Sequence, residues 1–494
     1  MEYERSKERN VATADQTNQP FGATKWGTHR GYFIAVDSKV PIDPERMAKA
    51  FEETVDRHGS FRTTFHWDEE KGKLLQTIHP SVDVHNTSIV DLSGEQNAYK
   101  KAYDMSLANN VDPNFSLSKL PLISFVVFTL GSGMYAFNIV VHHIVTDETS
   151  LEIFLRDLLQ LYTHGPGSLP PVQLHYSDFS DWLLRTANRR TELRDEQLKY
   201  WSQKLDGVQP LTLTIAAPSE VEQSPASQIK AQIGPFSLKR YNDYIATTPV
   251  TPFTAFFAAY NLLLYKYSTQ KSFVVGAGIS QRPMSQFQEV VGPFTDVLPI
   301  RTTIEEETTF AEYLETFHHD LAADLSNDDV TLEDIVSHTK TSSQDHPHIK
   351  HLFAPGGPNV RIANHCGASD IAAAAVSLPN GGEIYEFLFT AHHETGEVTL
   401  RFDEGIYTKG AARRFLDAYR SLIDTLGRDP HVKIGDIPAF GDKERYRLSR
   451  EFPACGPISL VEDKSHQPAK VQAKRTIATV QLHPFTCCTC LLSN

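Results

Sequence analysis

The sequence predicts an α+β fold of two lobes of similar size, followed by a weakly ordered tail. Two observations support it: runs of β-forming residues alternate with helical patterns up to about residue 447, and this alternation starts afresh after Trp201. A third is that the chain has no internal repeat of the length that solenoids and propellers use. We therefore assign a polar N-terminal segment, an N-terminal lobe, a C-terminal lobe and the tail to residues 1–19, 20–185, 186–447 and 448–494.

The first clear element is a helix in the stretch IDPERMAKAFEETVDRHG. Asp43 is placed to cap its N-terminus and Pro44 suits its first turn. One apolar stripe at helical spacing is formed by Met47, Phe51 and Val55. The following stretch, SFRTTFHWD, has the composition of a strand.

A β-hairpin and a helix complete the predicted N-terminal lobe. Leu122–Leu130 and Met134–Val145 are β-rich runs joined by the turn sequence GSG. A helix then starts at Thr149 or Ser150 and stops before Gly165 and Pro166.

The second half repeats this alternation after a polar, basic helix around LLRTANRRTELRDEQLKYW. Its expected elements, in chain order, are a strand near Leu211–Ile215, a strand after Ser227, a helix from Pro252, the strand SFVVGAG and a helix over Gly410–Gly427.

Composition limits the classes of function. A net charge of -14 argues against binding nucleic acid or anionic membrane surfaces, although RTANRRTELR forms one local basic cluster. No apolar run is long enough to cross a membrane, and the polar start does not resemble a secretory signal. Three of the five cysteines crowd the last eight residues, which is no disulfide framework. We expect a cytoplasmic monomer.

The stretch IVVHHIVTDETS carries the strongest candidate for chemistry. His142 and His143 are adjacent on a predicted strand, so their side chains point to opposite faces and cannot readily share a metal ion. They are either two structural histidines or a structural His142 beside a general base, His143. Asp147 would be a lone carboxylate near the sheet, and an unpaired buried charge costs several kcal/mol, so we expect an arginine partner.

HHIVTDETS resembles the HHxxxDG signature of condensation domains of nonribosomal peptide synthetases, in the chloramphenicol acetyltransferase-like superfamily. Further segments are similar to other motifs of this family, in the same order and over residues 20–447: DRHGSFRTTF, HYSDFSDWL, YWSQKL, SQRPMSQFQEVVGPFTDVLPIR and LSNDDVTLEDIV.

The resemblance implies two chloramphenicol acetyltransferase-like lobes in a V, with a tunnel between them. Phosphopantetheine arms on two partner carrier proteins enter this tunnel, and an acceptor amine or hydroxyl attacks the donor thioester. His143 matches the catalytic histidine, His142 is its structural neighbour, and Asp147 matches an aspartate paired with an arginine, for which Arg62 is the match. This chemistry needs no metal and no bound cofactor.

Three departures from the family pattern bear on the site. Glu148 replaces the glycine of HHxxxDG and either complements the dipole of the following helix or faces the tunnel and alters the choice of acceptor. Asp296 stands where the family has asparagine, and with Arg301 it is a candidate tunnel or substrate residue. The first helical motif of the family is not visible before FGATKWGTHRGYFIAVD.

The leading hypothesis is a free-standing condensation enzyme of secondary metabolism that forms an amide or an ester bond. The chain shows no carrier-protein serine motif and no adenylation-type phosphate loop, so we expect it to use carriers loaded elsewhere, or to be a fragment of a larger synthetase. One alternative is an O- or N-acyltransferase that uses acyl-CoA, although no DFGWG-like element is present. Epimerisation is a third enzymatic hypothesis, although the sequence contains no glutamate-rich motif of the kind that epimerising relatives have. A non-enzymatic alternative is a degenerate domain that only docks carriers.

Overall fold

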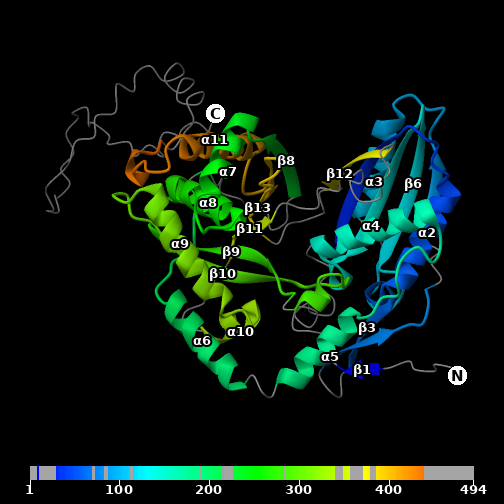
Figure 1. Cartoon of the computed structure of the whole chain (residues 1–494), viewed down its shortest axis with the longest axis horizontal. Helices are drawn as coiled ribbons and strands as arrows, with labels where there is room; N and C mark the ends of the chain where they lie inside the picture. The colour runs from blue at the N-terminus through cyan, green and yellow to red at the C-terminus, as the bar shows by residue number, and fades with distance from the viewer. Residues whose placement is uncertain are drawn as a thin grey trace, which may run out of the picture.

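The computed structural model describes residues 8–10, 29–68, 73–82, 87–111, 115–187, 191–213, 215, 226–282, 284–339, 349–355, 371–378 and 385–438. In these residues the chain forms two mixed α+β lobes, each built around a sheet (Figure 1). This confirms the predicted fold class. Apart from residues 8–10, the region expected to hold the first family motif lies outside the described residues, and so does the predicted tail.

The elements of the first half are β1 (Glu8–Asn10), β2 (His29–Ser38), α2 (Pro44–Arg57), η1 (Gly59–Arg62), β3 (Thr63–Asp68), β4 (Lys73–Ile78), β5 (Thr87–Asp91), α3 (Ala98–Val111), β6 (Ile123–Gly131), β7 (Met134–His142), η2 (His143–Val145), α4 (Glu148–His164), α5 (Tyr176–Ala187) and α6 (Thr191–Leu205), where η marks a 3-10 turn.

The elements of the second half are β8 (Ala226–Gln232), α7 (Pro235–Ile245), α8 (Pro252–Ser268), β9 (Ser272–Ser280), η3 (Ser285–Phe287), β10 (Thr295–Thr303), α9 (Phe310–Leu325), α10 (Leu332–His338), β11 (His351–Pro355), β12 (Ile371–Leu378), β13 (Phe387–Ala391), β14 (Glu397–Asp403), α11 (Lys409–Arg428) and η5 (Ile434–Asp436).

The N-terminal lobe contains a five-stranded sheet of order β12-β2-β7-β6-β5. Side chains of successive β2 residues point to opposite faces of this sheet. Tyr32 and Ile34 pack with α2 and α4 on one face, and Phe33 packs with α3 on the other. The edge strand β12 comes from the second half of the chain and pairs antiparallel with β2 from Ile371↔Ser38 to Leu378↔Gly31. The second half therefore contributes directly to the sheet of the first lobe (Figure 1).

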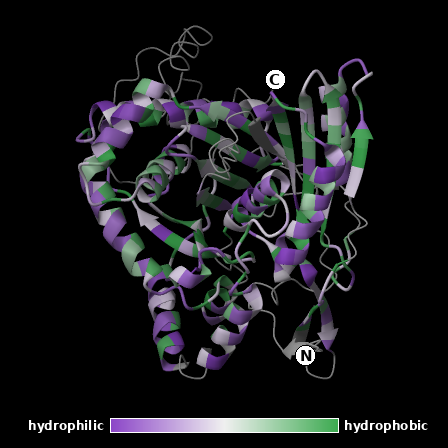
Figure 2. Ribbon diagram, turned by 45° about the vertical axis from the view of Figure 1, so that its right-hand side comes forward, coloured by the Kyte–Doolittle hydropathy of each residue, from purple (hydrophilic) through white to green (hydrophobic). Residues whose placement is uncertain are grey.

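The C-terminal lobe contains a six-stranded sheet of order β10-β9-β11-β13-β14-β8. Helix α8 lies in its core, with fourteen of its residues buried, and packs with α7, α9 and α11. Hydrophobic residues gather along the strands, while the outer helices mix hydrophobic and hydrophilic residues along their length (Figure 2). Among the described residues, no helix is both long and apolar enough to span a bilayer.

Several predicted elements are confirmed. Asp43 caps α2 by accepting hydrogen bonds from the backbone N–H groups of Glu45 and Arg46, at 3.0 and 3.1 Å. Strands β6 and β7 form the expected hairpin, and its turn residues Gly131 to Gly133 all have positive φ. Helix α4 ends at Gly165 as predicted but begins at Glu148, one residue earlier than expected, because Asp147 is its cap.

Two predicted elements are wrong in detail. The single basic helix is two helices, α5 and α6. No strand forms near Leu211–Ile215 in the residues described there; instead Leu211, Leu213 and Ile215 are buried in the core of the second lobe. Their alternating burial resembles that of a strand, but the segment has no partner strand.

Candidate active site

His143 lies where a strand of the first lobe gives way to a helix. Strand β7 ends at His142, His143 opens the turn η2, and α4 begins at Glu148. The side chain of His143 is partly exposed, whereas its neighbours on both sides are buried. Its Nδ1 lies 3.3 Å from the carbonyl oxygen of Thr146. Since a carbonyl oxygen can only accept, this contact places the imidazole proton on Nδ1 and leaves Nε2 with its lone pair.

The surroundings of His143 favour the neutral imidazole. Burial holds its pKa well below the ordinary value, and the positive charges of Arg30 and Arg401 lower the pKa further, against the opposing hydrogen bond to Thr146. A neutral ring with a free Nε2 is the form that can accept a proton at pH 7.

His142 has the contacts of a structural residue. Its side chain is 6% exposed, and its Nδ1 accepts a hydrogen bond from the backbone N–H of Ile144 at 3.1 Å. The ring meets Phe115 edge-on, with 6.5 Å between centroids. Burial and nearby His29 lower its pKa to about 4, so it stays neutral and can keep accepting from Ile144. His142 thereby shapes the turn that carries His143.

Asp147 caps α4 and joins it to the second lobe. Its Oδ1 accepts from the backbone N–H of Ser150 at 2.7 Å, and its Oδ2 accepts from the backbone N–H of Phe294 at 3.0 Å. Because the cap follows His143 by four residues, it fixes the start of α4 relative to the histidine turn.

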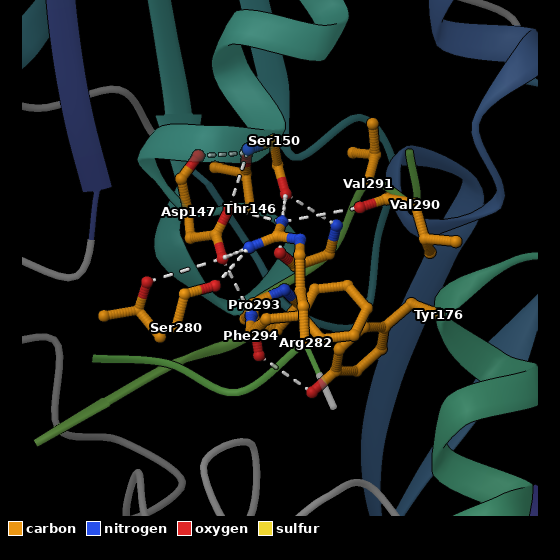
Figure 3. A network of polar contacts seen from close by, with 12 residues as sticks. Thr146, Asp147, Ser150, Tyr176, Ser280, Arg282, Val290, Val291, Pro293 and Phe294 are labelled. Atoms are coloured by element: carbon orange, nitrogen blue, oxygen red, sulfur yellow. Dashed lines mark hydrogen bonds and ion pairs between the residues drawn. The ribbon is translucent and has the colours of Figure 1, made fainter. Parts of the chain in front are cut away.

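The arginine that pairs with Asp147 is Arg282. Its Nη1 donates to Oδ2 at 3.0 Å and its Nη2 to Oδ1 at 2.9 Å, and both side chains are almost fully buried (Figure 3). Nη1 also donates to Ser280 and Nη2 to Ser150, while the guanidinium lies over the ring of Phe294, 4.3 Å from its centroid. Two parallel charge-assisted hydrogen bonds make this a strong and geometrically specific pair.

The predicted pair between Arg62 and Asp147 is therefore wrong. Arg62 instead donates to three backbone carbonyl oxygens, those of Asp56, His79 and Pro80. These contacts tie η1 to the segment after β4. The sequence did carry a signal for the true partner, because Arg282 lies in the segment SQRPM at the position of the arginine in the family's GR motif.

The loop before β10 is held against the first lobe by further bonds. Ser150 donates its hydroxyl to the carbonyl oxygen of Gly292, Ser60 to that of Val291 and Tyr176 to that of Pro293, at 2.7, 2.7 and 2.9 Å. A Cβ on Gly292 would lie 2.2 Å from the Tyr176 ring, so only glycine allows this approach. Polar contacts thus join the start of α4, its cap Asp147 and this loop into one network (Figure 3).

Glu148 is the first residue of α4 and is partly exposed. It is not among the residues with positive φ, so the replaced glycine is not needed for backbone conformation. A carboxylate in the first turn of a helix complements the dipole, as expected. Burial raises the pKa of Tyr32, the charge of Glu148 raises it further, and Arg30 and Arg401 oppose the rise. The same two arginines act on His143, so Glu148 lies near the same charged groups as His143.

Asp296 is the second residue of β10. Its Oδ1 accepts from the backbone N–H of Val297 at 2.7 Å, and its Oδ2 from Gln281 at 3.4 Å. Burial, with the nearby charges of Asp328 and Asp334, raises its pKa to about 6. A substrate role for Asp296 stays a prediction.

Arg301 lies six residues farther along β10 than Thr295, the residue next to the site. It donates to the hydroxyl of Ser272 and to the backbone carbonyls of Lys204 and Asp206, at 3.0, 3.0 and 3.1 Å. These bonds tie the end of α6 to the sheet of the second lobe. A tunnel role for Arg301 stays a prediction, with no contact to the histidine turn that supports it.

Comparison with known proteins gives the family. The condensation domain model matches residues 28–449. The chain is 24% identical over 458 residues to bacitracin synthase 1 of Bacillus licheniformis, and 24% identical over 419 residues to gramicidin S synthase 2 of Aneurinibacillus migulanus. These alignments cover 91% and 83% of this chain but only 8% and 9% of the two relatives, so the chain corresponds to a small part of them.

Solved structures show the same fold. The first condensation domain of the calcium-dependent antibiotic synthetase matches with a TM-score of 0.73 at 18% identity, over 88% of this chain and 99% of that one. The condensation domain of the monacolin K polyketide synthase matches with a TM-score of 0.68 at 17% identity, over 83% and 94%. The motif resemblance is thus confirmed across most of the sequence: the chain belongs to the condensation domain family.

Proposed function

We propose that this chain forms an amide bond, or an ester bond, by transferring an acyl group from a carrier-protein thioester to an amine or hydroxyl acceptor in nonribosomal peptide biosynthesis. Membership of the condensation domain family supports the reaction class. The observation that carries the residue assignment is the state of His143: a neutral, partly exposed imidazole whose Nδ1 faces the Thr146 carbonyl.

The reaction uses His143 as a base. The acceptor nitrogen attacks the thioester carbonyl carbon, a C–N bond forms and the carbonyl electrons move to oxygen. Nε2 of His143 takes the proton that the nitrogen loses. When the carbonyl re-forms, the C–S bond breaks and the departing pantetheine thiolate takes this proton, which returns His143 to its neutral form.

Remote contacts hold the base in place. The Asp147–Arg282 pair fixes the start of α4, and the buried ring of His142 fixes the turn before it. A base held in this way needs little reorganisation to reach a reactive geometry, which is where much of the rate of such a transfer arises. The phosphopantetheine belongs to the substrates, since the carrier proteins deliver it.

The test supplies loaded carriers as separate proteins. The full chain is incubated with a donor acyl-carrier and with amine or alcohol acceptors, free or carrier-bound, and products are identified by mass spectrometry. An acyl-acceptor product that requires the chain supports the proposal, and its bond type decides between amide and ester. Turnover with acyl-CoA in place of the acyl-carrier would point to a soluble-thioester acyltransferase. No product with any pair would instead favour a domain that only docks carriers.

A further inference from the structure

Arg30 lies on the same face of the first sheet as the histidine. It is the second residue of β2, in register with Val141 of β7, and Tyr32 pairs with Ile139 two residues farther along. Residues paired across antiparallel strands share a face, and the face of Tyr32 and Val141 is the one that packs with α4. His143 comes directly after the last residue of β7, two residues past Val141, so Arg30 lies at the end of the sheet from which the histidine turn leaves, and its charge acts on His143.

The guanidinium of Arg30 is available for a ligand. Its side chain is partly exposed, and within the part of the chain that the structure describes no hydrogen bond or ion pair engages it. Arg282 is the contrast, because both of its terminal nitrogens are committed to Asp147 and to serine hydroxyls. Arg30 is thus a cation near the base whose donors are not engaged by any residue that the structure describes.

The charge of Arg30 acts on His143. After burial, Arg30 is the largest influence lowering the pKa of His143, and it also opposes the rise in the pKa of Tyr32. Arg401 of β14 acts on both groups in the same direction. Two arginines, one from each lobe, therefore contribute positive charge near His143. Of the two, Arg30 has the partly exposed side chain, whereas Arg401 is buried.

The proposed reaction creates negative charge at this place. Attack on the thioester carbonyl turns its oxygen into an oxyanion at the moment when His143 gains a proton. We propose that Arg30 is a catalytic residue that donates to this oxyanion and stabilises it. The inference rests on the proposed function, because it assigns the charge-stabilising group of the same reaction. A preorganised cation costs no reorganisation when the charge develops.

The experiment compares Arg30→Gln and Arg30→Lys with wild type in the full chain. In one arm the donor acyl group and the acceptor carry no carboxylate, and in a second arm the acceptor carries a free carboxylate. Arg413→Gln is the matched control, since it removes an exposed guanidinium on α11, in the other lobe. We expect Arg30→Gln to lower kcat by about a hundredfold with KM little changed, and Arg30→Lys to recover much of the loss, by analogy with the removal of one oxyanion donor.

A second readout needs no turnover. In an NMR titration of the substrate-free protein, Arg30→Gln should raise the pKa of His143, and Arg413→Gln should leave it unchanged. An unchanged His143 in Arg30→Gln overturns the inference, as does a kcat within twofold of the Arg413→Gln control, or a loss confined to KM. A loss seen only with substrates that carry a carboxylate also overturns it, in favour of recognition of that group. Failure of the proposed function is distinguished because wild type itself would then give no product.

Discussion

Arg282, which follows the last residue of β9 by two positions, binds both carboxylate oxygens of Asp147, 135 residues earlier in the chain. The two residues come from different lobes, and both are nearly fully buried. Asp147 also caps α4, four residues after His143. A single ion pair therefore couples the contact between the lobes to the position of the histidine turn.

The first prediction concerns the strength of this pair. Replacing Arg282 with alanine leaves Asp147 charged and buried, so we expect a loss of about 3–5 kcal/mol in the free energy of unfolding. Lys100→Ala is the control, because it removes an exposed pair with Asp104 that contributes at most about 1 kcal/mol. Denaturant unfolding measures both. A double-mutant cycle should show coupling of Asp147 with Arg282 and none with Arg62; coupling with Arg62 would contradict the structure.

The second prediction follows from the depressed pKa of His142. The unfolded state takes up a proton near the ordinary pKa of 6.5, whereas the folded state does so only near about 4. The stability that neutral His142 contributes is therefore complete above pH 6.5 and is lost as the pH falls toward 4. We expect His142→Gln to have a flatter decline in unfolding free energy over this interval than wild type. His393→Gln, at an exposed histidine, should keep the wild-type slope, and a slope in His142→Gln equal to wild type would refute the assignment.

Asp296 gives a prediction of opposite sign. Its pKa is raised from 3.8 to about 6, so folding disfavours its charged form, and this cost appears as the pH rises from 3.8 through 6. Asp296→Asn removes the charge and keeps the shape. The quantity to compare is the unfolding free energy of the variant minus that of wild type. We expect this difference to be larger above pH 6 than below pH 4. Thermal unfolding at pH 4 and pH 8 measures this, and an equal difference at both pH values would be inconsistent with a partly buried carboxylate near other acidic groups.

Glu148 tests whether the family glycine is needed for backbone shape. Because Glu148 opens a helix and does not have positive φ, glycine at this position brings no relief of strain. We expect Glu148→Gly to lower the unfolding free energy by about 0.5–1 kcal/mol through backbone entropy and the loss of a favourable charge at the helix start. Glu148→Gln, which keeps the side-chain shape, serves as the control. A clear stabilisation by glycine would mean that the turn is strained in the natural sequence.

The sequence predicts which types of residue the site needs better than it predicts which residues come together. A lone carboxylate near a sheet requires an arginine, and the structure contains one. The sequence does not identify that arginine, because Arg62 and Arg282 both lie in family-like segments and only the packing of the lobes brings one of them to Asp147. The side chains of His142 and His143 were expected to separate, and their different burial and partners agree with that.

The sequence also does not show which strands pair when they lie far apart in the chain. Periodicity located α2, the β6–β7 hairpin and α4, because each depends on local spacing and turn residues. Periodicity does not show that β12, from the second half of the chain, pairs with β2, because the sequence of a strand does not specify its partner strand. For the same reason Leu211–Ile215 resembles a strand, although none of its described residues pairs with a strand.

The most direct test of the role of His143 is the rate of acyl transfer by His143→Ala, with one donor acyl-carrier and the best acceptor found for wild type. His393→Ala is the matched control, because His393 is also the second of two adjacent histidines but is exposed on the surface. Loss of a general base lowers rates by about 10²–10⁴-fold, and we expect a decrease in this range with an unchanged unfolding midpoint and a fully active control. A folded His143→Ala protein that transfers the acyl group at the wild-type rate would contradict the account.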